Sequence, residues 1–504
     1  MNNRVQHYDI QGNRYHRGLL LALTLFASFA AALMQTSLGT ALPRLMKVFD
    51  INLNTVQQAT TWFLLAMAMM VPVSATLIKR FSVRNLSFVA YASLAAGVAI
   101  SAFTPAEHDF WFLFVLGRIL AALAVGVMFP LLQIIIVNIY QEHERALAMG
   151  LMGLVVGMAP ALGPTLTGWI LDKKHVILGL TISNSWHIIF YLPLAVIIIS
   201  MILCPFLIKD VIKKEKARFD WPSLVISSTG FGLFLFGFTN VASNGWGNWP
   251  NVVGPIFSGA ILIGLFVWRQ LKLAVPFLDV RVFKSSRFTL STTATALVTM
   301  AMMGVEMMLP TYLQNVHDLS PLKSGLTLLP GALLMGLFSP IAGKLYDIAG
   351  IKRVTITGFS ILALGTLPFA FIDTATETSI ILVMYTLRMI GIALVLMPLA
   401  SESMAALPLA KTTDGTAVNN TVRQIASSVG VAILTSITQN VINHNEPVKS
   451  LKTSDPLRYL DCYLSASMDG FRVAFTIGFL FAIIGLGLSF YFKSQRSVEE
   501  GQSK

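Results

Sequence analysis

Four charged side chains lie inside long apolar stretches of this chain, where an ion is costly to hold. They are Arg118, Glu306, Arg388 and Arg423. Ionisable groups in such surroundings usually pair with one another or line a route for ions and substrates. Glu306 could bind and release a proton, and Arg118 could sense that event. The same residues could instead be structural, with Glu306 held by a neighbouring helix and the arginines packing helices together.

Uncharged polar residues share helical faces with these ions. At about 100° per residue, Thr299 lies on the same face as Glu306, and Asn420 lies on the same face as Arg423. Gln35 belongs to a third polar stripe, which carries no charge. Such faces either line a cavity or form hydrogen bonds to neighbouring helices. The candidate cavity residues are therefore Gln35, Thr299, Arg388, Asn420 and Arg423.

Residues 150–169 are dense in small side chains at fourfold spacing. Small residues let two helices approach closely. Two prolines in the middle of the stretch remove backbone hydrogen bonds and bend a helix. The stretch therefore predicts either a hinge between two parts of the molecule or plain tight packing. Its key residues are Gly157, Pro160, Gly163, Pro164 and Gly168.

The elements that position these residues must cross a membrane. Hydrophobic residues make up 55% of the chain and charged residues 12%, whereas about 25% of an ordinary soluble domain is charged. Apolar runs of about 20 residues recur from end to end, and each is long enough to span a bilayer as a helix. We predict an all-α membrane protein with fourteen spans, at 18–42, 56–78, 85–104, 111–136, 146–170, 186–208, 222–242, 252–271, 288–310, 322–343, 353–372, 379–400, 415–440 and 471–492.

Two parts of the chain repeat each other. Residues 72–84 align without a gap on residues 340–352, 268 positions later, and Arg118 and Arg388 keep nearly the same separation. Duplicated halves in a membrane protein are typical of transporters whose site lies between the halves. The predicted units are residues 1–208 and 288–504, two six-helix bundles with a pseudo-twofold repeat, and residues 209–287, which hold cytoplasmic linkers and an inserted helix pair.

Positive charge is spread unevenly over the predicted loops. The formal net charge of +12 would by itself fit a nucleic-acid partner. Most Lys and Arg residues, however, fall in short loops on one side of the predicted membrane, as cytoplasmic loops do. Residues 1–17 are polar, and the apolar run after them is too long for a cleavable signal. We expect a multi-pass protein of the cell membrane, with both termini cytoplasmic and no nucleic-acid partner.

The sequence lacks the signatures of enzymes and metal sites. It has no Gly-rich phosphate loop, no evident Ser/His/Asp arrangement and no cluster of metal ligands. Cys204 and Cys462 are predicted on opposite sides of the membrane, so they cannot pair. We expect no catalytic activity, no cofactor and no metal. We also expect a monomer whose partners are the lipid bilayer, protons and a small-molecule substrate.

Several motifs resemble one group of transporters. Residues 159–169 are similar to the antiporter motif of the fourteen-helix drug:proton antiporters in the major facilitator superfamily. Residues 219–222, 276–283 and 309–314 are similar to other motifs of that group, so the resemblance covers nearly the whole chain. It implies two bundles that rock about a central site, coupled to the proton gradient. For Arg118 it implies the proton-coupling role of the family's fourth-helix arginine.

The same resemblance implies cytoplasmic gate loops after the second helix of each half. In the family this loop carries an acidic residue and glycines. The second half keeps that pattern, whereas the first half has Lys79 at the acidic position. On the first helix, Met34 stands where the family often has an aspartate. The gate-loop residues so implied are Arg80, Arg84, Asp347 and Lys352.

Three functions follow from these observations. The leading one is a proton-coupled secondary transporter that exports amphipathic drugs or toxic compounds by alternating access. The alternative is a proton-linked carrier, in uptake or export, of one small organic anion, because the predicted spans contain three arginines and one glutamate. A sensor or scaffold that transports nothing would need an additional soluble domain, and none is visible in the sequence.

Overall fold

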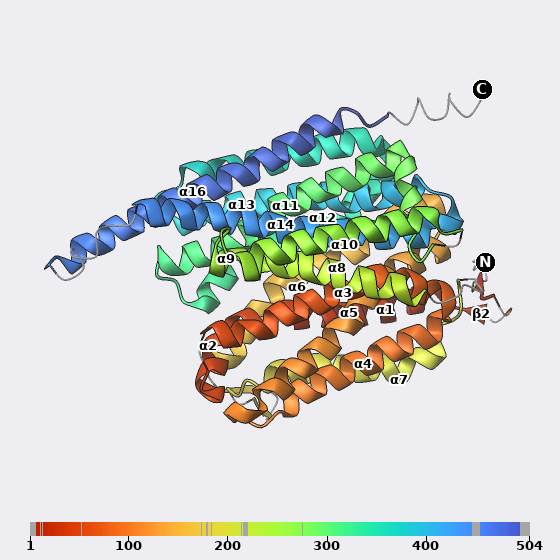
Figure 1. Ribbon diagram of the computed structural model, residues 1–504, viewed down its shortest axis with the longest axis horizontal. Coiled ribbons are helices and arrows are strands. Elements are labelled where there is room, and N and C mark those ends of the chain that lie inside the picture. Colours follow the sequence, from red (N-terminus) through yellow and green to blue (C-terminus); the bar gives the residue numbers. More distant parts are fainter. Residues whose placement is uncertain are drawn as a thin grey trace.

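The computed structural model describes residues 7–493, except 11, 13, 52, 173, 178, 179, 183, 213, 215–219, 275 and 446–453. Residue 219 of the predicted motif and five of the ten linker residues 209–218 lie outside the described residues. The long helices run nearly side by side along one direction (Figure 1). The helical conformation satisfies the backbone hydrogen bonds within each segment, as a span in lipid requires.

The first half of the chain forms seven helices and two short hairpins. Ser37 separates the first two helices, so the run predicted at 18–42 is not one helix. The helices are α1 Arg17–Thr36, α2 Leu38–Phe49, α3 Leu53–Arg80, α4 Val83–Phe103, α5 Trp111–Ile139, α6 Glu142–Asp172 and α7 Ile188–Leu207. The hairpins pair β1 His7–Tyr8 with β2 Arg14–Tyr15 and β3 His175–Ile177 with β4 Leu180–Ile182.

The rest of the chain continues the same pattern. Its helices are α8 Trp221–Thr239, α9 Val241–Asn244, α10 Gly254–Lys272, α11 Ser286–Asn315, α12 Pro321–Thr366, α13 Thr378–Ala405, α14 Thr412–Asn445 and α16 Pro456–Ser489. Short 3₁₀ turns lie at η1 His108–Phe110, η3 Val280–Lys284, η4 Leu367–Phe371 and η5 Leu409–Lys411, and one π turn lies at η2 Trp249–Val253.

The predicted count of fourteen spans is confirmed. Thirteen described helices are long and apolar enough to cross a membrane, and one of them, Leu322–Phe371, has 50 residues and is long enough to cross twice. It is divided at Gly350, whose φ of 76° is left-handed and breaks α12. A residue with a Cβ adopts that conformation at a cost, whereas glycine does not. The turn between these two spans is therefore far tighter than the predicted limits of 343 and 353 suggest.

Each half packs around its own apolar core, and the halves meet along two seams. One core lies among α1 to α7 and another among α11 to α16. In the first seam α3 and α5 contact α14, and in the second seam α6 contacts α12 and α13. The inserted helices α8 and α10 pair with each other, and α8 also contacts α3 and α14 (Figure 1). The inserted pair therefore lies against the first seam.

Both described ends of the chain lie at one end of the molecule. The start of α1 and the end of α16 lie on the same side of Figure 1, whereas the start of α16 projects on the opposite side. We call the first of these ends the terminal face. Because consecutive spans alternate in direction, α3 ends and α14 begins at this face, and so the residues that close the first seam there come from distant parts of the sequence.

Candidate functional site

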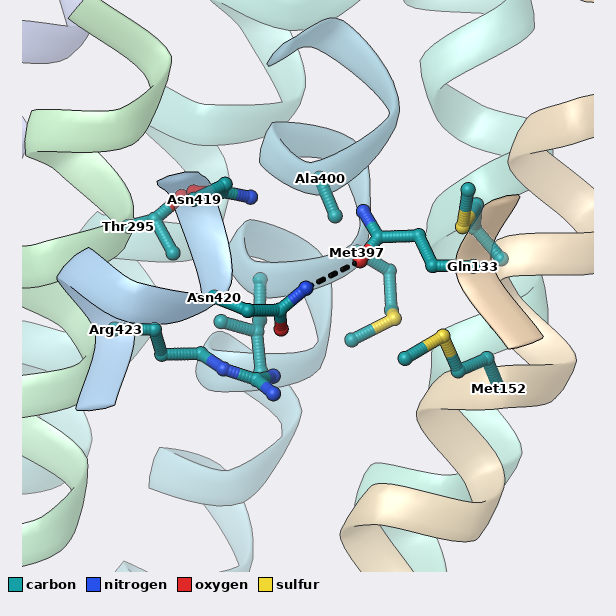
Figure 2. A pocket seen from close by; sticks show the side chains of 10 residues that line it. Gln133, Met152, Thr295, Met397, Ala400, Asn419, Asn420 and Arg423 are labelled. Carbon is teal, nitrogen blue, oxygen red and sulfur yellow. Dashed lines mark hydrogen bonds between the residues drawn. The ribbon is translucent and has the colours of Figure 1, made fainter. Parts of the chain in front are cut away.

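A small cavity lies where the two halves meet. Helices α5, α6, α11, α13 and α14 enclose about 20 Å³ of space, which is close to the room that one water molecule needs. Figure 2 shows its wall, with Asn420 and Arg423 on one side and Gln133 and Met152 on the other. In this conformation the cavity is nearly closed. Its lining residues are Gln133, Met149, Met152, Thr295, Leu396, Met397, Ala400, Asn419, Asn420 and Arg423.

A hydrogen bond joins the halves across this cavity. The Asn420 Nδ2 on α14 donates to the Gln133 Oε1 on α5 at 2.9 Å (Figure 2). The same Nδ2 donates to the backbone carbonyl of Thr416 at 2.9 Å. The Nε2 of Gln133 is buried and finds no acceptor among the described residues. This donor therefore remains available to whatever enters the cavity.

The methionine wall depends on the glycine-rich helix α6. Met149 and Met152 come from α6, and Met397 comes from α13. A Cβ on Gly153 would lie 2.6 Å from the Met397 Cγ, so glycine permits this contact. Methionine is flexible and polarisable, which suits a wall that must fit irregular apolar groups.

Two of the five residues predicted to line a cavity lie at this one. Asn420 and Arg423 line it, whereas Gln35, Thr299 and Arg388 are not among its lining residues. Gln35 is partly exposed near the end of α1. The Thr299 hydroxyl donates to the carbonyl of Thr295, the α11 residue that does line the cavity.

Gln133 was not expected from the sequence. It is a single amide in a long apolar run, without the polar stripe that identified Asn420 and Arg423. The available signal was its isolation, because a polar side chain inside a span rarely faces lipid. Gln133 is only 3% exposed.

Arg118 is fully enclosed between helices of the first half. Its Nη1 donates to the backbone carbonyl of Met34 at 2.8 Å. Its Cζ lies 4.1 Å from the centre of the Phe63 ring, and a ring face attracts a cation. Its Nε and Nη2 find no acceptor among the described residues. Arg118 thus joins α5 to α1 and α3 without a carboxylate.

Arg388 makes the equivalent contact in the second half. Its Nη2 donates to the carbonyls of Ala301 and Met302 on α11. Met302 lies 268 positions after Met34, so the repeat extends to this contact. Arg388 also interacts electrostatically with Glu306, although the two side chains form no direct ion pair. The sequence interpretation linked Glu306 with Arg118, whereas the structure places Arg388 beside it.

The Glu306 carboxylate lies on α11 without a hydrogen bond to its buried oxygen. Its Oε2 has no partner among the described residues. Tyr385, one turn before Arg388 on α13, is a further electrostatic neighbour. A buried acceptor that is left unsatisfied costs about 1–3 kcal/mol. A proton on Glu306 would neutralise the carboxylate, and a proton carrier needs a group that can do this.

An ion pair closes the first seam at the terminal face. The Lys79 Nζ of α3 lies 2.5 Å from the Asp414 Oδ2 of α14. The Asp414 Oδ1 accepts a hydrogen bond of 3.0 Å from the backbone N–H of Asp279. The Thr76 hydroxyl donates to the carbonyl of Phe277 at 2.9 Å. The segment before η3 is therefore hydrogen-bonded to both halves, through Thr76 of α3 and Asp414 of α14.

Of the other predicted gate residues, two follow Lys79 closely in the sequence and two lie on α12. Arg80 ends α3, and the Arg84 backbone N–H donates to the Asp210 Oδ1 at 3.1 Å. Asp347 and Lys352 flank the break at Gly350 in α12. The ionic contact that closes the seam comes instead from Lys79, at the position where the resemblance expects an acidic residue.

The second seam is closed by close backbone approach. A Cβ on Gly343 of α12 would collide with the backbone carbonyl of Ala146, and one on Gly150 would collide with Pro340. Along the same helix α6, Gly157 faces Met335 and Gly163 faces Thr36. A Cβ on Gly168 would lie 3.6 Å from the Cα of Leu322. Pro160 and Pro164 lie within α6, between these contacts.

Residues 24–431 match the family model described as Major Facilitator Superfamily. The chain is 36% identical over 493 residues to the uncharacterized MFS-type transporter YcnB of Bacillus subtilis (strain 168), which covers 98% of each chain. It is 33% identical over 477 residues to the lincomycin resistance protein LmrB of Listeria innocua, covering 95% of this chain and 97% of that protein. It is 25% identical to the multidrug resistance protein Stp of Mycobacterium tuberculosis, covering 82% and 74%.

Solved structures share the fold at low sequence identity. The human organic anion transporter MFSD10 (TETRAN) aligns with a TM-score of 0.60 and 13% identity, covering 92% of this chain and 99% of that one. The proton:xylose symporter XylE aligns with a TM-score of 0.57 and 12% identity, covering 92% and 94%. At this identity the likeness concerns the fold alone.

Proposed function

Because the chain belongs to the major facilitator superfamily, a family of carriers, we propose that it exports amphipathic compounds in exchange for protons. The central cavity carries this proposal, since both thioethers and polar groups line it. Such walls can hold a molecule with an apolar part and a polar part. Two relatives are named for lincomycin resistance and for multidrug resistance, which supports export of foreign compounds.

Transport proceeds by alternating access between two bodies, residues 1–208 and 288–504, with residues 209–287 between them. To open the cavity toward the terminal face, the molecule must separate Lys79 from Asp414. Helix α6 acts as the hinge, because Gly150, Gly153 and Gly157 bring it close to α12 and α13 along the second seam. The halves can then rotate about α6 while the first seam opens and closes.

Glu306 carries the coupled proton. Its buried oxygen lacks a partner among the described residues, and Arg388 is a positively charged neighbour. Protonation would weaken the attraction between Glu306 and Arg388 and shift the balance between the two open states, because a bound proton acts as a ligand with unequal affinity for them. Arg118 retains a supporting role by holding the first helices of its half together.

The terminal face is cytoplasmic. The described loops at this face hold many basic residues, as cytoplasmic loops do. Both chain ends then lie in the cytoplasm, and the protein acts as a monomer in the cell membrane. Basic residues at the terminal face include Lys79, Arg80, Arg84, Arg145, Lys272, Arg281, Lys284, Arg287, Lys352 and Lys411.

A second candidate function is a proton-linked carrier for one small organic anion. Arg423 lines the cavity, and the ten described lining residues include no Asp or Glu. A cavity with a single positive charge favours an anionic ligand. This function differs from the first in its narrow specificity, and uptake is open to it as well as export.

Inside-out vesicles with an imposed pH gradient test both candidates. The panel contains amphipathic compounds of each charge and a set of small organic acids. Gradient-driven accumulation of amphipathic compounds is the result expected from the proposed export. Movement of one organic acid alone would favour the second candidate. Transport that does not respond to the gradient would contradict proton coupling in both.

A further inference from the structure

The central cavity offers hydrogen-bond donors from two sides, the Arg423 guanidinium and the Gln133 amide. We infer that it binds a carboxylate on the substrate, through the Arg423 guanidinium and the Gln133 amide, and that it excludes organic cations. The inference rests on the proposed function, because it takes this cavity as the transport site. The substrates are then amphipathic carboxylates, whose apolar part lies against Met149, Met152 and Met397.

The hydrogen bonds around Asn420 fix which end of the Gln133 amide is the donor. Asn420 donates through its Nδ2 to the Thr416 carbonyl, which can only accept. The same Nδ2 meets Gln133, so the atom that Gln133 presents must be its oxygen. The Nε2 of Gln133 is consequently a buried donor without a partner among the described residues. Buried donors in native proteins are nearly always paired, so this one calls for an acceptor from a ligand.

Arg423 supplies the positive charge. It lies on α14 one turn after Asn420, and Figure 2 shows its guanidinium reaching toward the cavity. No carboxylate or carbonyl among the described residues pairs with it. Guanidinium offers planar, paired donors that match the two oxygens of a carboxylate. In surroundings of low polarity, the same charge strongly repels a second cation.

The cavity must expand to admit such a ligand. Its present volume of about 20 Å³ is far below the roughly 300 Å³ of a small-molecule site. Three of its lining residues are methionines, whose side chains change rotamer easily. The hydrogen bond between Asn420 and Gln133 crosses between the halves, so opening of the seam would release the Gln133 oxygen as well. The closed cavity is therefore the state without substrate.

Binding to the purified full-length protein tests this inference without requiring transport. Phenylbutyrate, phenylbutyramide and phenylbutylamine share one apolar part and differ in the polar group. We expect ligand-induced thermal stabilisation in the order carboxylate, amide, amine, with the amine at least about tenfold weaker than the carboxylate. Tighter binding of the amine, or equal binding of all three, would overturn the inference.

Two variants assign the effect to residues. Arg423→Gln should weaken phenylbutyrate about tenfold and leave phenylbutyramide nearly unchanged, so that the amide also reports correct folding. Arg423→Lys keeps the charge and should retain part of the carboxylate preference. Gln133→Leu should weaken both the carboxylate and the amide. If phenylbutyrate binds Arg423→Gln as tightly as the unmodified protein, Arg423 does not read the carboxylate and the inference is wrong.

The outcome is separable from that of the proposed function. Vesicles that transport amphipathic compounds through the wild type, combined with binding that ignores the polar group, would retain export and reject the carboxylate site. Selective carboxylate binding without gradient-driven transport would reject proton-coupled export and keep the site.

Discussion

Arg118 and Arg388 occupy equivalent positions in the two halves, yet only one of them has a carboxylate beside it. Each donates to a carbonyl on the first helix of its half, at Met34 or Met302. Arg388 adds the electrostatic interaction with Glu306. The residue 268 positions before Glu306 is Leu38. The duplication thus preserved the structural contact, and among the described residues a carboxylate lies beside this arginine in the second half only.

The two seams between the halves are also closed by different kinds of contact. The first is closed by the ion pair of Lys79 with Asp414, whereas the second is closed by glycine contacts at α6 and α12. The repeat mate of Lys79 is Asp347 on α12. On α6, Glu144 pairs with Arg17 of its own half at 2.6 Å, so this ion pair does not cross the second seam. A seam held by charge can open in response to water and ions, whereas a seam held by close packing serves better as a pivot.

Removal of the Asp414 carboxylate should have the largest effect on stability. Asp414→Ala leaves Lys79, whose side chain is 14% exposed, without its counter-charge. A buried pair that loses one partner typically costs about 3–5 kcal/mol. We expect the first seam to open at the terminal face, measured as increased labelling of a cysteine introduced beside Thr76.

The charge swap is the matched control for that variant. Lys79→Asp combined with Asp414→Lys restores the attraction, but its lysine cannot accept the Asp279 N–H. We expect most of the protection to return, short of about 1 kcal/mol for the lost hydrogen bond. If the swap labels as fast as Asp414→Ala, the charge pair does not close the seam.

Gly343→Ala should have the next largest effect, at the second seam. Its Cβ would meet the backbone carbonyl of Ala146, and overpacking of this kind costs about 1–3 kcal/mol. We expect slower transport and a lower melting temperature. Ala75, the repeat mate of Gly343, is buried at the first seam. Ala75→Gly should cost no more than about 1 kcal/mol, and an equal loss at both sites would contradict the difference between the seams.

Replacement of each buried arginine by methionine sharpens the comparison between the halves. Arg118→Met removes a charge without leaving a carboxylate behind, so its stability should change by less than about 1 kcal/mol. Arg388→Met leaves Glu306 without its positive neighbour and should cost about 1–2 kcal/mol. Only Arg388→Met should shift the pH dependence of transport. Equal shifts in both variants would remove the functional difference between the halves.

The inserted pair provides a reference outside both repeats. Burial alone would raise the pKa of Asp220, but hydrogen bonds from Arg269 and Ser223 outweigh it and lower that pKa below its usual value. The resulting stability is present above the ordinary carboxyl pKa and disappears as the pH falls through the lowered one. Asp220→Asn should cost less than about 1 kcal/mol at neutral pH.

Thermal melts of Asp220→Asn and the wild type across acidic pH check this small effect. The two curves should converge on acidification. A gap that persists at low pH would mean that Asp220 acts through packing and not through its charge.

Hydropathy predicted the spans because each needs about 20 apolar residues. It could not predict the break at Ser37, where the backbone stays right-handed, or the tight turn at Gly350, because one residue hardly changes an average over a span. Asn420 and Arg423 were predictable as polar side chains on one helical face. The pairing of Lys79 with Asp414, 335 residues apart, depends on how the halves pack, and the sequence alone contains no pattern for it.

The most direct test of proton coupling compares Glu306→Gln with the wild type in proteoliposomes. Two assays use the same substrate: accumulation driven by a pH gradient, and exchange of labelled for unlabelled substrate without a gradient. The account predicts that Glu306→Gln loses gradient-driven accumulation by at least about tenfold and retains exchange. Undiminished accumulation with the pH dependence of the wild type would contradict the assignment of the proton to Glu306.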